Sequence, residues 1–129
     1  QRVLGEFRLI PLVVGEASAD EVAEVIERLW GGPETRFVIS SDLSHYHDYA
    51  TAKRMDKATS QAIEPLRPEA IGYEDACGRI PVSGLLRAAR RHGLRGRILD
   101  LRNSGDTAGP RDQVVGYGAY AFDEDPAAA

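Results

Sequence analysis

Residues 36–49, RFVISSDLSHYHDY, join a short run of β-forming residues to a polar cluster. The run RFVIS at 36–40 has the composition of a strand. Residues 40–48 follow it directly and contain two of the chain's three histidines and two aspartates. In α/β proteins, ligands bind beyond the carboxyl ends of strands. We therefore predict a strand that delivers Asp42, His45 and His47 to a functional site.

The rest of the chain alternates strand and helix patterns around this stretch. Strands are predicted at 7–14, 36–40, 96–101 and 114–122, and helices at 18–29, 49–64 and 81–92, with a turn or short helix at 68–74. Ser18 and Glu21 have the spacing of a capping box, and Pro81 suits the first turn of a helix. The alternation predicts a layered α/β domain over residues 1–122, with a mostly parallel sheet and flanking helices. The tail at 123–129 is expected to be disordered.

Composition narrows the class of protein. The 129 residues are 43% hydrophobic with a net charge of −4, which fits one domain with a core and argues against nucleic acid as a partner. No apolar run approaches the roughly 20 residues that cross a bilayer, so no membrane association is expected. The single cysteine cannot form an intrachain disulfide and fits a reducing compartment. We expect a cytoplasmic location.

Asp42 and His45 are candidates for catalysis because they stand three residues apart just after a strand. If the backbone curls, both side chains face one pocket, where the carboxylate orients the imidazole or the pair belongs to a metal site. The alternative is that Asp42 caps the next turn and His45 lies on the surface. His47 and Asp48 are expected nearer the rim of the pocket.

Cys77 precedes a predicted helix N-terminus and has Arg79 close by, a setting whose positive potential favours the thiolate. A thiolate can be a nucleophile or a soft metal ligand. The alternative is a buried small side chain.

The loop RNSGDTAGPR at 102–111 places Arg102 and Asp106 among glycines and could bind an anionic group, or it could be a solvated connection.

Three stretches together resemble the Memo-like family, also called AmmeMemoRadiSam system protein B. They are VISSDLSHYHDY, ACGRIPVSGLL and DLRNSGDTAGPRDQVVGYGAYAF, and they occur in the family's order. The resemblance implies a fold related to class III extradiol dioxygenases and a metal site for non-haem iron or copper. It places Cys77 at the family's metal-ligand cysteine, with Asp42 and His45 lining the same pocket and His45 as acid/base or outer ligand.

The resemblance also implies that the chain is the C-terminal half of a larger domain. The missing N-terminal half, or a second chain, is then expected to supply further metal ligands.

The leading hypothesis is a metal-binding, redox-linked protein similar to a dioxygenase. An alternative is a non-catalytic module that binds an anionic peptide or small molecule through His47, Arg79, Arg102 and Asp106. A third is a metal-independent hydrolase with Cys77 as nucleophile.

Overall fold

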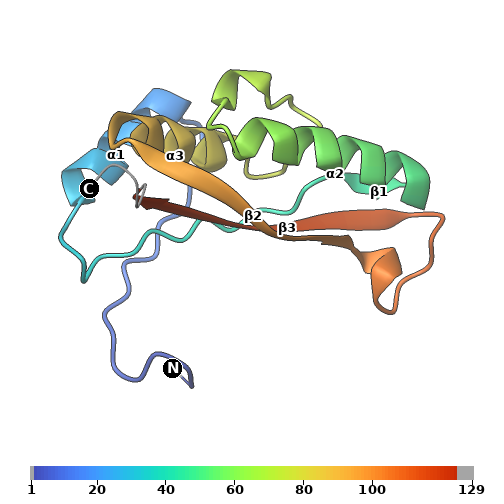
Figure 1. Ribbon diagram of the computed structural model, residues 1–129, viewed down its shortest axis with the longest axis horizontal. Helices are drawn as coiled ribbons and strands as arrows, with labels where there is room; N and C mark the ends of the chain where they lie inside the picture. The colour runs from blue at the N-terminus through green and yellow to red at the C-terminus, as the bar shows by residue number, and fades with distance from the viewer. Residues whose placement is uncertain (1, 125–129) are drawn as a thin grey trace.

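The computed structural model describes residues 2–124, in which three helices lie on one face of a small sheet (Figure 1). The chain order is α1 (Ala19–Leu29), β1 (His45–His47), α2 (Tyr49–Ile63), the 3-10 turn η1 (Pro68–Ala70), α3 (Arg79–Arg91), β2 (Leu94–Asn103), the 3-10 turn η2 (Ser104–Asp106) and β3 (Val114–Glu124). The strands lie in the order β1-β3-β2. The predicted mixture of helices and sheet is confirmed.

The sheet is antiparallel, which corrects the expected mostly parallel pairing. β2 runs against β3 from the pair Leu94 and Glu124 to the pair Asn103 and Gly116, and the register shifts between Ile98 and Asp100. β1 also runs antiparallel to β3. Antiparallel neighbours can be joined by a loop, whereas parallel strands need a long crossover, usually a helix. The segment between β2 and β3 contains only η2 and irregular chain, so it permits the antiparallel arrangement.

The helices begin within two residues of their predicted starts, and Asp48, expected at the rim of the pocket, is the N-cap of α2. Ser18 caps α1 in a complete capping box: its hydroxyl accepts from the Glu21 amide, and the Glu21 carboxylate accepts from the Ser18 amide at 2.8 Å. Asp48 caps α2 by accepting hydrogen bonds from the amides of Ala50 and Thr51. Pro81 lies in the first turn of α3, where its missing N–H leaves no broken hydrogen bond. Short-range chemistry therefore determines all three starts.

The hydrophobic core lies between the helices and one face of β2 and β3. Its buried members come from α2, α3 and the chain between them: Ala62, Ile63, Leu66, Ile71, Leu86 and Ala89. Partly buried residues of α3 and of the two strands pack against them: Val82, Leu94, Tyr120 and Phe122. The helix α1 packs on α3, where Gly84 leaves room for Val22. The helices thus cover only one side of the sheet.

Two predicted strands are not strands in the structure. Residues 7–14 have no regular structure and are exposed throughout, and residues 36–40 are likewise irregular. The prediction was wrong because β composition creates a strand only when a neighbour completes its backbone hydrogen bonds. Between residues 2 and 124, no strand pairs with either segment. Burial still alternates at 36–40: Phe37 stacks on Trp30 at 5.4 Å, while Val38 is 88% exposed.

The end of the chain also differs from the prediction. Asp123 and Glu124, assigned to a disordered tail, belong to β3 and pair with Arg95 and Leu94. The Asp123 carboxylate also lies 2.6 Å from the Arg97 guanidinium. The remaining predicted tail, 125–129, lies outside the described residues. Among the helices of residues 2–124, none has the length and apolar character needed to cross a bilayer.

Candidate metal centre

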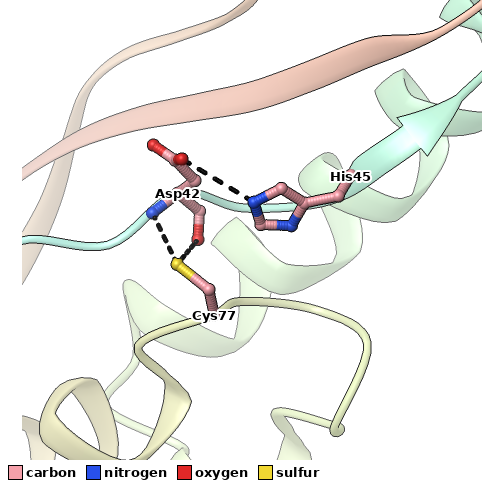
Figure 2. Close-up of side chains that lie close together, drawn as sticks. All are labelled: Asp42, His45 and Cys77. Atoms are coloured by element: carbon pink, nitrogen blue, oxygen red, sulfur yellow. Dashed lines mark hydrogen bonds and ion pairs between the residues drawn. The ribbon is translucent and has the colours of Figure 1, made fainter.

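Three potential metal ligands meet beside β1: Asp42, His45 and Cys77 (Figure 2). Their ligand atoms all lie within 4.8 Å of one another, and Asp42 Oδ2 is 3.7 Å from His45 Nε2. Asp42 lies in the extended segment before β1, His45 begins β1, and Cys77 precedes the N-cap of α3. Two distant parts of the sequence therefore supply one cluster.

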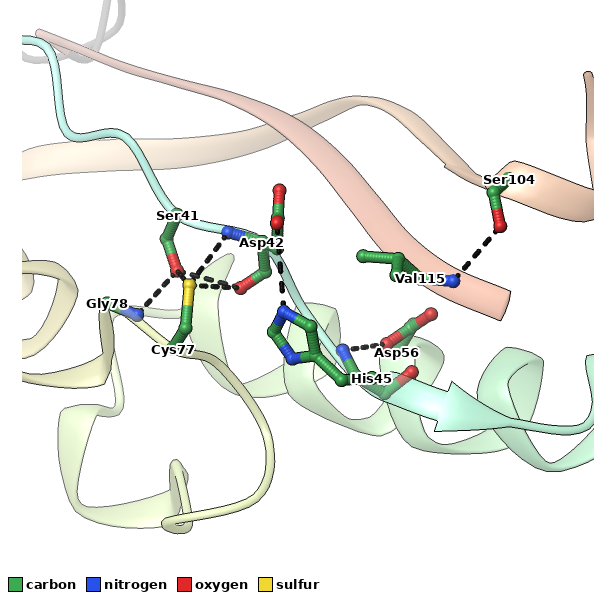
Figure 3. Close-up of polar contacts among 9 residues, drawn as sticks. Ser41, Asp42, His45, Asp56, Cys77, Gly78, Ser104 and Val115 are labelled. Carbon is green, nitrogen blue, oxygen red and sulfur yellow. Dashed lines mark hydrogen bonds and ion pairs between the residues drawn. The ribbon is translucent and has the colours of Figure 1, made fainter. Parts of the chain in front are cut away.

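The segment that carries Asp42 and His45 is held against β3 and α2. The Leu43 amide donates to the Gly116 carbonyl at 2.8 Å, and the Gly116 amide donates to the Ser44 carbonyl at 2.9 Å. On the other side, the Ser44 amide donates to Asp56 Oδ1 at 2.9 Å (Figure 3). Asp56 is only 2% exposed and belongs to α2. These backbone contacts fix the two residues that lie between Asp42 and His45.

The Cys77 sulfur lies among polar groups of Ser41 and Asp42. The Asp42 amide donates to Cys77 Sγ at 3.3 Å, and the Ser41 hydroxyl lies 3.7 Å from the same sulfur. The Gly78 amide donates to Ser41 Oγ at 2.9 Å, which holds the serine against the start of α3 (Figure 3). The Asp42 carbonyl lies 3.9 Å from the same sulfur, so the thiol can also donate to it. This setting is consistent with Cys77 as a ligand.

The donor atoms suit a metal ion better than a catalytic pair in direct contact. At 3.7 Å the Asp42 and His45 atoms are too far apart for a good hydrogen bond. Ligands at 2.0–2.3 Å from one ion would be separated by roughly 3–4 Å, close to the observed spacing. The cluster is also open, because the side chains are 48% exposed for Asp42 and 33% for His45, and Cys77 is exposed. Sulfur, nitrogen and oxygen donors together are acceptable to iron, copper or zinc.

The other predicted residues lie around this cluster or elsewhere. His47 is two residues further along β1, is partly buried and pairs through its backbone with Val114. Arg79 begins α3, and its guanidinium carbon lies 5.3 Å from the centre of the Tyr73 ring. Neither side chain forms a hydrogen bond or ion pair with Asp42, His45 or Cys77 in the part of the chain that the structure describes. A role of His47 and Arg79 in ligand binding therefore stays a prediction.

Arg102 and Asp106 line a separate cleft of about 460 Å³ beside α2. Arg102 Nε lies 2.7 Å from Asp100 Oδ2. Asp106 accepts hydrogen bonds from the Tyr49 hydroxyl at 2.6 Å and from the Asn103 amide at 3.0 Å, and these bonds lower its pKa below the usual range. The full lining is Lys53, Asp56, Lys57, Asp100, Leu101, Arg102, Asn103 and Asp106, without Asp42, His45 or Cys77.

Sequence reasoning missed Asp56, Lys53 and Lys57, which the structure places in this cleft. Asp56 also supports the segment between Asp42 and His45 through the Ser44 amide. In the sequence, Asp56 stands among polar residues of a helix and resembles any solvated position. No local pattern could have indicated its burial, because its contacts with Ser44 and Gly116 are made across the fold.

Comparison with known proteins gives a consistent match over the chain. The family model described as Memo-like protein matches residues 1–121. A MEMO1 family protein of Aeropyrum pernix is 36% identical over 126 residues. A MEMO1 family protein of Aquifex aeolicus is 34% identical over 128 residues, and one of Methanosarcina barkeri is 33% identical over 127 residues.

These matches cover most of this chain but less than half of each relative. The Aeropyrum match covers 89% of this chain and 45% of the relative. The Aquifex match covers 91% and 48%, and the Methanosarcina match covers 88% and 48%. The chain therefore spans about half the length of the curated relatives that it matches.

Proposed function

Because the chain belongs to the Memo-like family, we propose that it is a metal-binding, redox-linked protein whose ligands are Cys77, His45 and Asp42. The observation that carries the proposal is the approach of three different donor atoms to within 4.8 Å. Such a set combines a soft thiolate with an imidazole and a carboxylate. Non-haem iron or copper is the proposed metal, as the resemblance implies.

Each residue has a distinct proposed role. Cys77 binds through its sulfur, which the Asp42 amide and the Ser41 hydroxyl already surround. His45 binds or moves a proton through Nε2, the atom that faces Asp42. Asp42 binds through a carboxylate oxygen or fixes the orientation of the imidazole. A bound iron or copper would supply Lewis acidity and one-electron chemistry. A dioxygenase-like reaction is the finer form of this proposal.

The proposal is tested by metal binding to purified variants. Under anaerobic conditions, wild-type protein titrated with Fe²⁺ or Cu⁺ should bind about one ion per chain. Cys77→Ala and His45→Gln should each weaken metal binding at least tenfold. Removal of a group that only supports a metal ligand typically lowers metal affinity by about 10- to 100-fold, and removal of the ligand itself should cost more. His92→Gln is the matched control, since His92 stacks on Trp30 and contacts Glu27 at 2.8 Å.

Equal metal affinity in wild type and Cys77→Ala would remove Cys77 as a ligand and contradict the proposal. Loss of metal binding in His92→Gln as well would indicate a general effect on folding. Circular dichroism of each variant distinguishes unfolding from the loss of a metal ligand. Metal-dependent consumption of oxygen, with and without catechols, then tests the dioxygenase-like reaction. Binding without any oxygen consumption would support the metal site and contradict that reaction.

A second candidate function rests on the cleft beside α2. Its cationic side chains, Lys53, Lys57 and Arg102, are the groups that would bind an anionic small molecule or peptide, and three carboxylates in the same lining balance their charge: Asp56, Asp100 and Asp106. An anion would compete with Asp100 for Arg102, whose guanidinium is already 2.7 Å from that carboxylate. This function predicts binding that persists in excess chelator and is weakened by Lys57→Gln. Binding abolished by the chelator would contradict it.

A further inference from the structure

Tyr46, which lies between the two histidines of β1, has a backbone conformation that bulky residues rarely adopt. Its φ is 61°, in the left-handed region. Among residues 2–124, Leu66 is the one other residue besides glycine with a positive φ, and it follows α2. The helix end accounts for Leu66, because the Arg67 amide donates to the Ala62 carbonyl at 2.8 Å and closes the last turn. Tyr46 is not at the end of a helix, so its conformation has another cause.

Tyr46 is the extra residue of a β-bulge. His45 pairs with Val115 and His47 pairs with Val114, so three residues of β1 lie opposite two residues of β3. Bulges are frequent next to active sites, where they redirect a side chain. Burial of the Tyr46 ring does not offset the backbone strain, because this residue is 72% exposed. The strain is therefore tied to the bulge rather than to packing of the ring.

The chain on both sides of Tyr46 is anchored to other segments. Before it, the Ser44 carbonyl accepts a hydrogen bond from the Gly116 amide at 2.9 Å. After it, the Tyr49 amide donates to the Arg111 carbonyl at 2.9 Å, where α2 begins. A residue stays in a sparsely populated backbone region only when its surroundings fix it there, and such residues cluster at functional sites. These two anchors hold Tyr46 in the left-handed region.

The bulge directs the two histidines to opposite faces of the sheet. Residues directly opposite each other in an antiparallel pair share a face, and successive residues of a strand alternate between faces. Val114 and Val115 are successive residues of β3, so their partners in β1 also face opposite ways. Figure 2 shows the His45 ring directed at Asp42, whereas His47 shares the face of the fully buried Val114. In a regular ladder, without the extra residue, both histidines would share one face.

We propose that Tyr46 is a positioning residue for the metal site. Its left-handed backbone forms the bulge that directs His45 into the ligand cluster, and the same bulge turns His47 away from that cluster. The Tyr46 ring also lies 5.9 Å from the His45 ring, in a tilted contact at 56°. The role in metal binding rests on the proposed function, whereas the role in the register of β1 does not.

Substitutions at residue 46 separate the effect of the backbone from that of the ring. Tyr46→Gly removes the ring but favours the left-handed region, so Fe²⁺ affinity should stay within about threefold of wild type. Tyr46→Val should weaken Fe²⁺ binding by roughly tenfold or more, because a β-branched residue disfavours that region. Anaerobic titration measures both variants. Equal losses in the two variants would assign the effect to the ring and overturn the proposal, and so would unchanged affinity in Tyr46→Val.

The register of β1 is measured separately, on the metal-free protein. Cross-strand NMR contacts should place His47 opposite Val114 in wild type and in Tyr46→Gly. In Tyr46→Val, regular pairing should place residue 46 opposite Val114 and His47 opposite Gln113. The wild-type register in Tyr46→Val would overturn the proposal. Wild-type protein that has the bulge but binds no metal would contradict the proposed function, while the role of Tyr46 in the register would stand.

Leu99→Val is the matched control. Leu99 is the extra residue where the register of β2 shifts between Ile98 and Asp100, and it is 56% exposed, but its φ is not positive. A β-branched residue suits such a backbone. Leu99→Val should therefore keep the wild-type metal affinity. A loss as large as that of Tyr46→Val would overturn the assignment of the effect to the left-handed conformation.

Discussion

Asp56 and Gly116 meet where α2 approaches β3, directly behind the segment that carries Asp42 and His45. The Asp56 carboxylate accepts a hydrogen bond from the Ser44 amide, and Gly116 exchanges backbone hydrogen bonds with Leu43 and Ser44. A Cβ at residue 116 would collide with the Asp56 carboxylate. The absence of a side chain at Gly116 is therefore a structural requirement of the site.

Gly116→Ala should lower the free energy of unfolding by about 1–3 kcal/mol, because the added methyl group must displace a buried carboxylate. It should also weaken metal binding, since the segment between Asp42 and His45 would move. Urea denaturation and metal titration measure the two effects. Gly15→Ala is the control, because a Cβ at Gly15 meets nothing within 4 Å. Unchanged stability of Gly116→Ala would contradict the described packing.

The Tyr49 hydroxyl holds the pKa of Asp106 below its ordinary value of 3.8, with the Asn103 amide as the next cause. Because the folded pKa is lowered, charged Asp106 stabilises the fold above the unfolded pKa, and this stabilisation is lost as pH falls through the lowered folded pKa. Tyr49→Phe should raise the pKa of Asp106, while it keeps the ring that lies 4.5 Å from the Arg111 guanidinium carbon.

NMR titration of the Asp106 carboxyl carbon measures this change. Tyr117→Phe should leave the Asp106 midpoint in place, because Tyr117 is an exposed residue of β3 and is not among the groups that shift the pKa of Asp106. A midpoint that stays unchanged in Tyr49→Phe would show that the hydrogen bond to Tyr49 does not control this carboxyl group.

At the scale of elements, one polar contact joins α2 to β3 inside the core. The hydroxyls of Ser60 and Tyr120 lie 2.7 Å apart, and Ser60 is 1% exposed. Burial raises the pKa of Tyr120, although the hydrogen bond to Ser60 acts in the opposite direction. Tyr120 thus keeps its proton over the ordinary pH range and can donate to Ser60 or accept from it. The contact fixes how α2 sits on the strand.

Tyr120→Phe should lower the free energy of unfolding by about 1–3 kcal/mol, because it leaves the buried Ser60 hydroxyl without this partner. Ser60→Ala should have a similar effect. The double variant should be less destabilised than the sum of the single variants, by about 0.5–3 kcal/mol. Chemical denaturation of the four proteins completes the cycle. Strict additivity would mean that the two hydroxyls do not interact.

At the scale of the whole molecule, stability should be uneven between the two sides of the sheet. The helical side contains the core, whereas residues 7–14 are exposed and lack regular structure. Segments with few buried contacts open at low free-energy cost. The N-terminal segment should therefore be the first part of the isolated chain to react with proteases.

Brief trypsin digestion of the isolated chain should cut first after Arg8, which lies in the unpaired segment. Arg87 should resist cleavage, because it lies within α3 and forms an ion pair with Asp20. Mass spectrometry of early fragments identifies the order. Cleavage after Arg87 before Arg8 would contradict the uneven stability.

The amino-acid sequence by itself indicated the helices and the candidate pair Asp42 and His45. Ser18, Asp48 and Pro81 act on residues of their own helices, so these starts can be read from the chain. Asp42 and His45 are three residues apart, so their side chains face one pocket only if the backbone between them curls, and the fold supplies that conformation. The position of Cys77 before α3 also follows from local signals.

Only the tertiary structure decided the direction of strand pairing, the lack of pairing at residues 7–14 and 36–40, and the support that Asp56 gives the site. It also decided the contact between the Asp42 amide and Cys77, 35 residues apart. Strand pairing and burial depend on atoms that are distant in the sequence, and β composition carries no information about which partner is present.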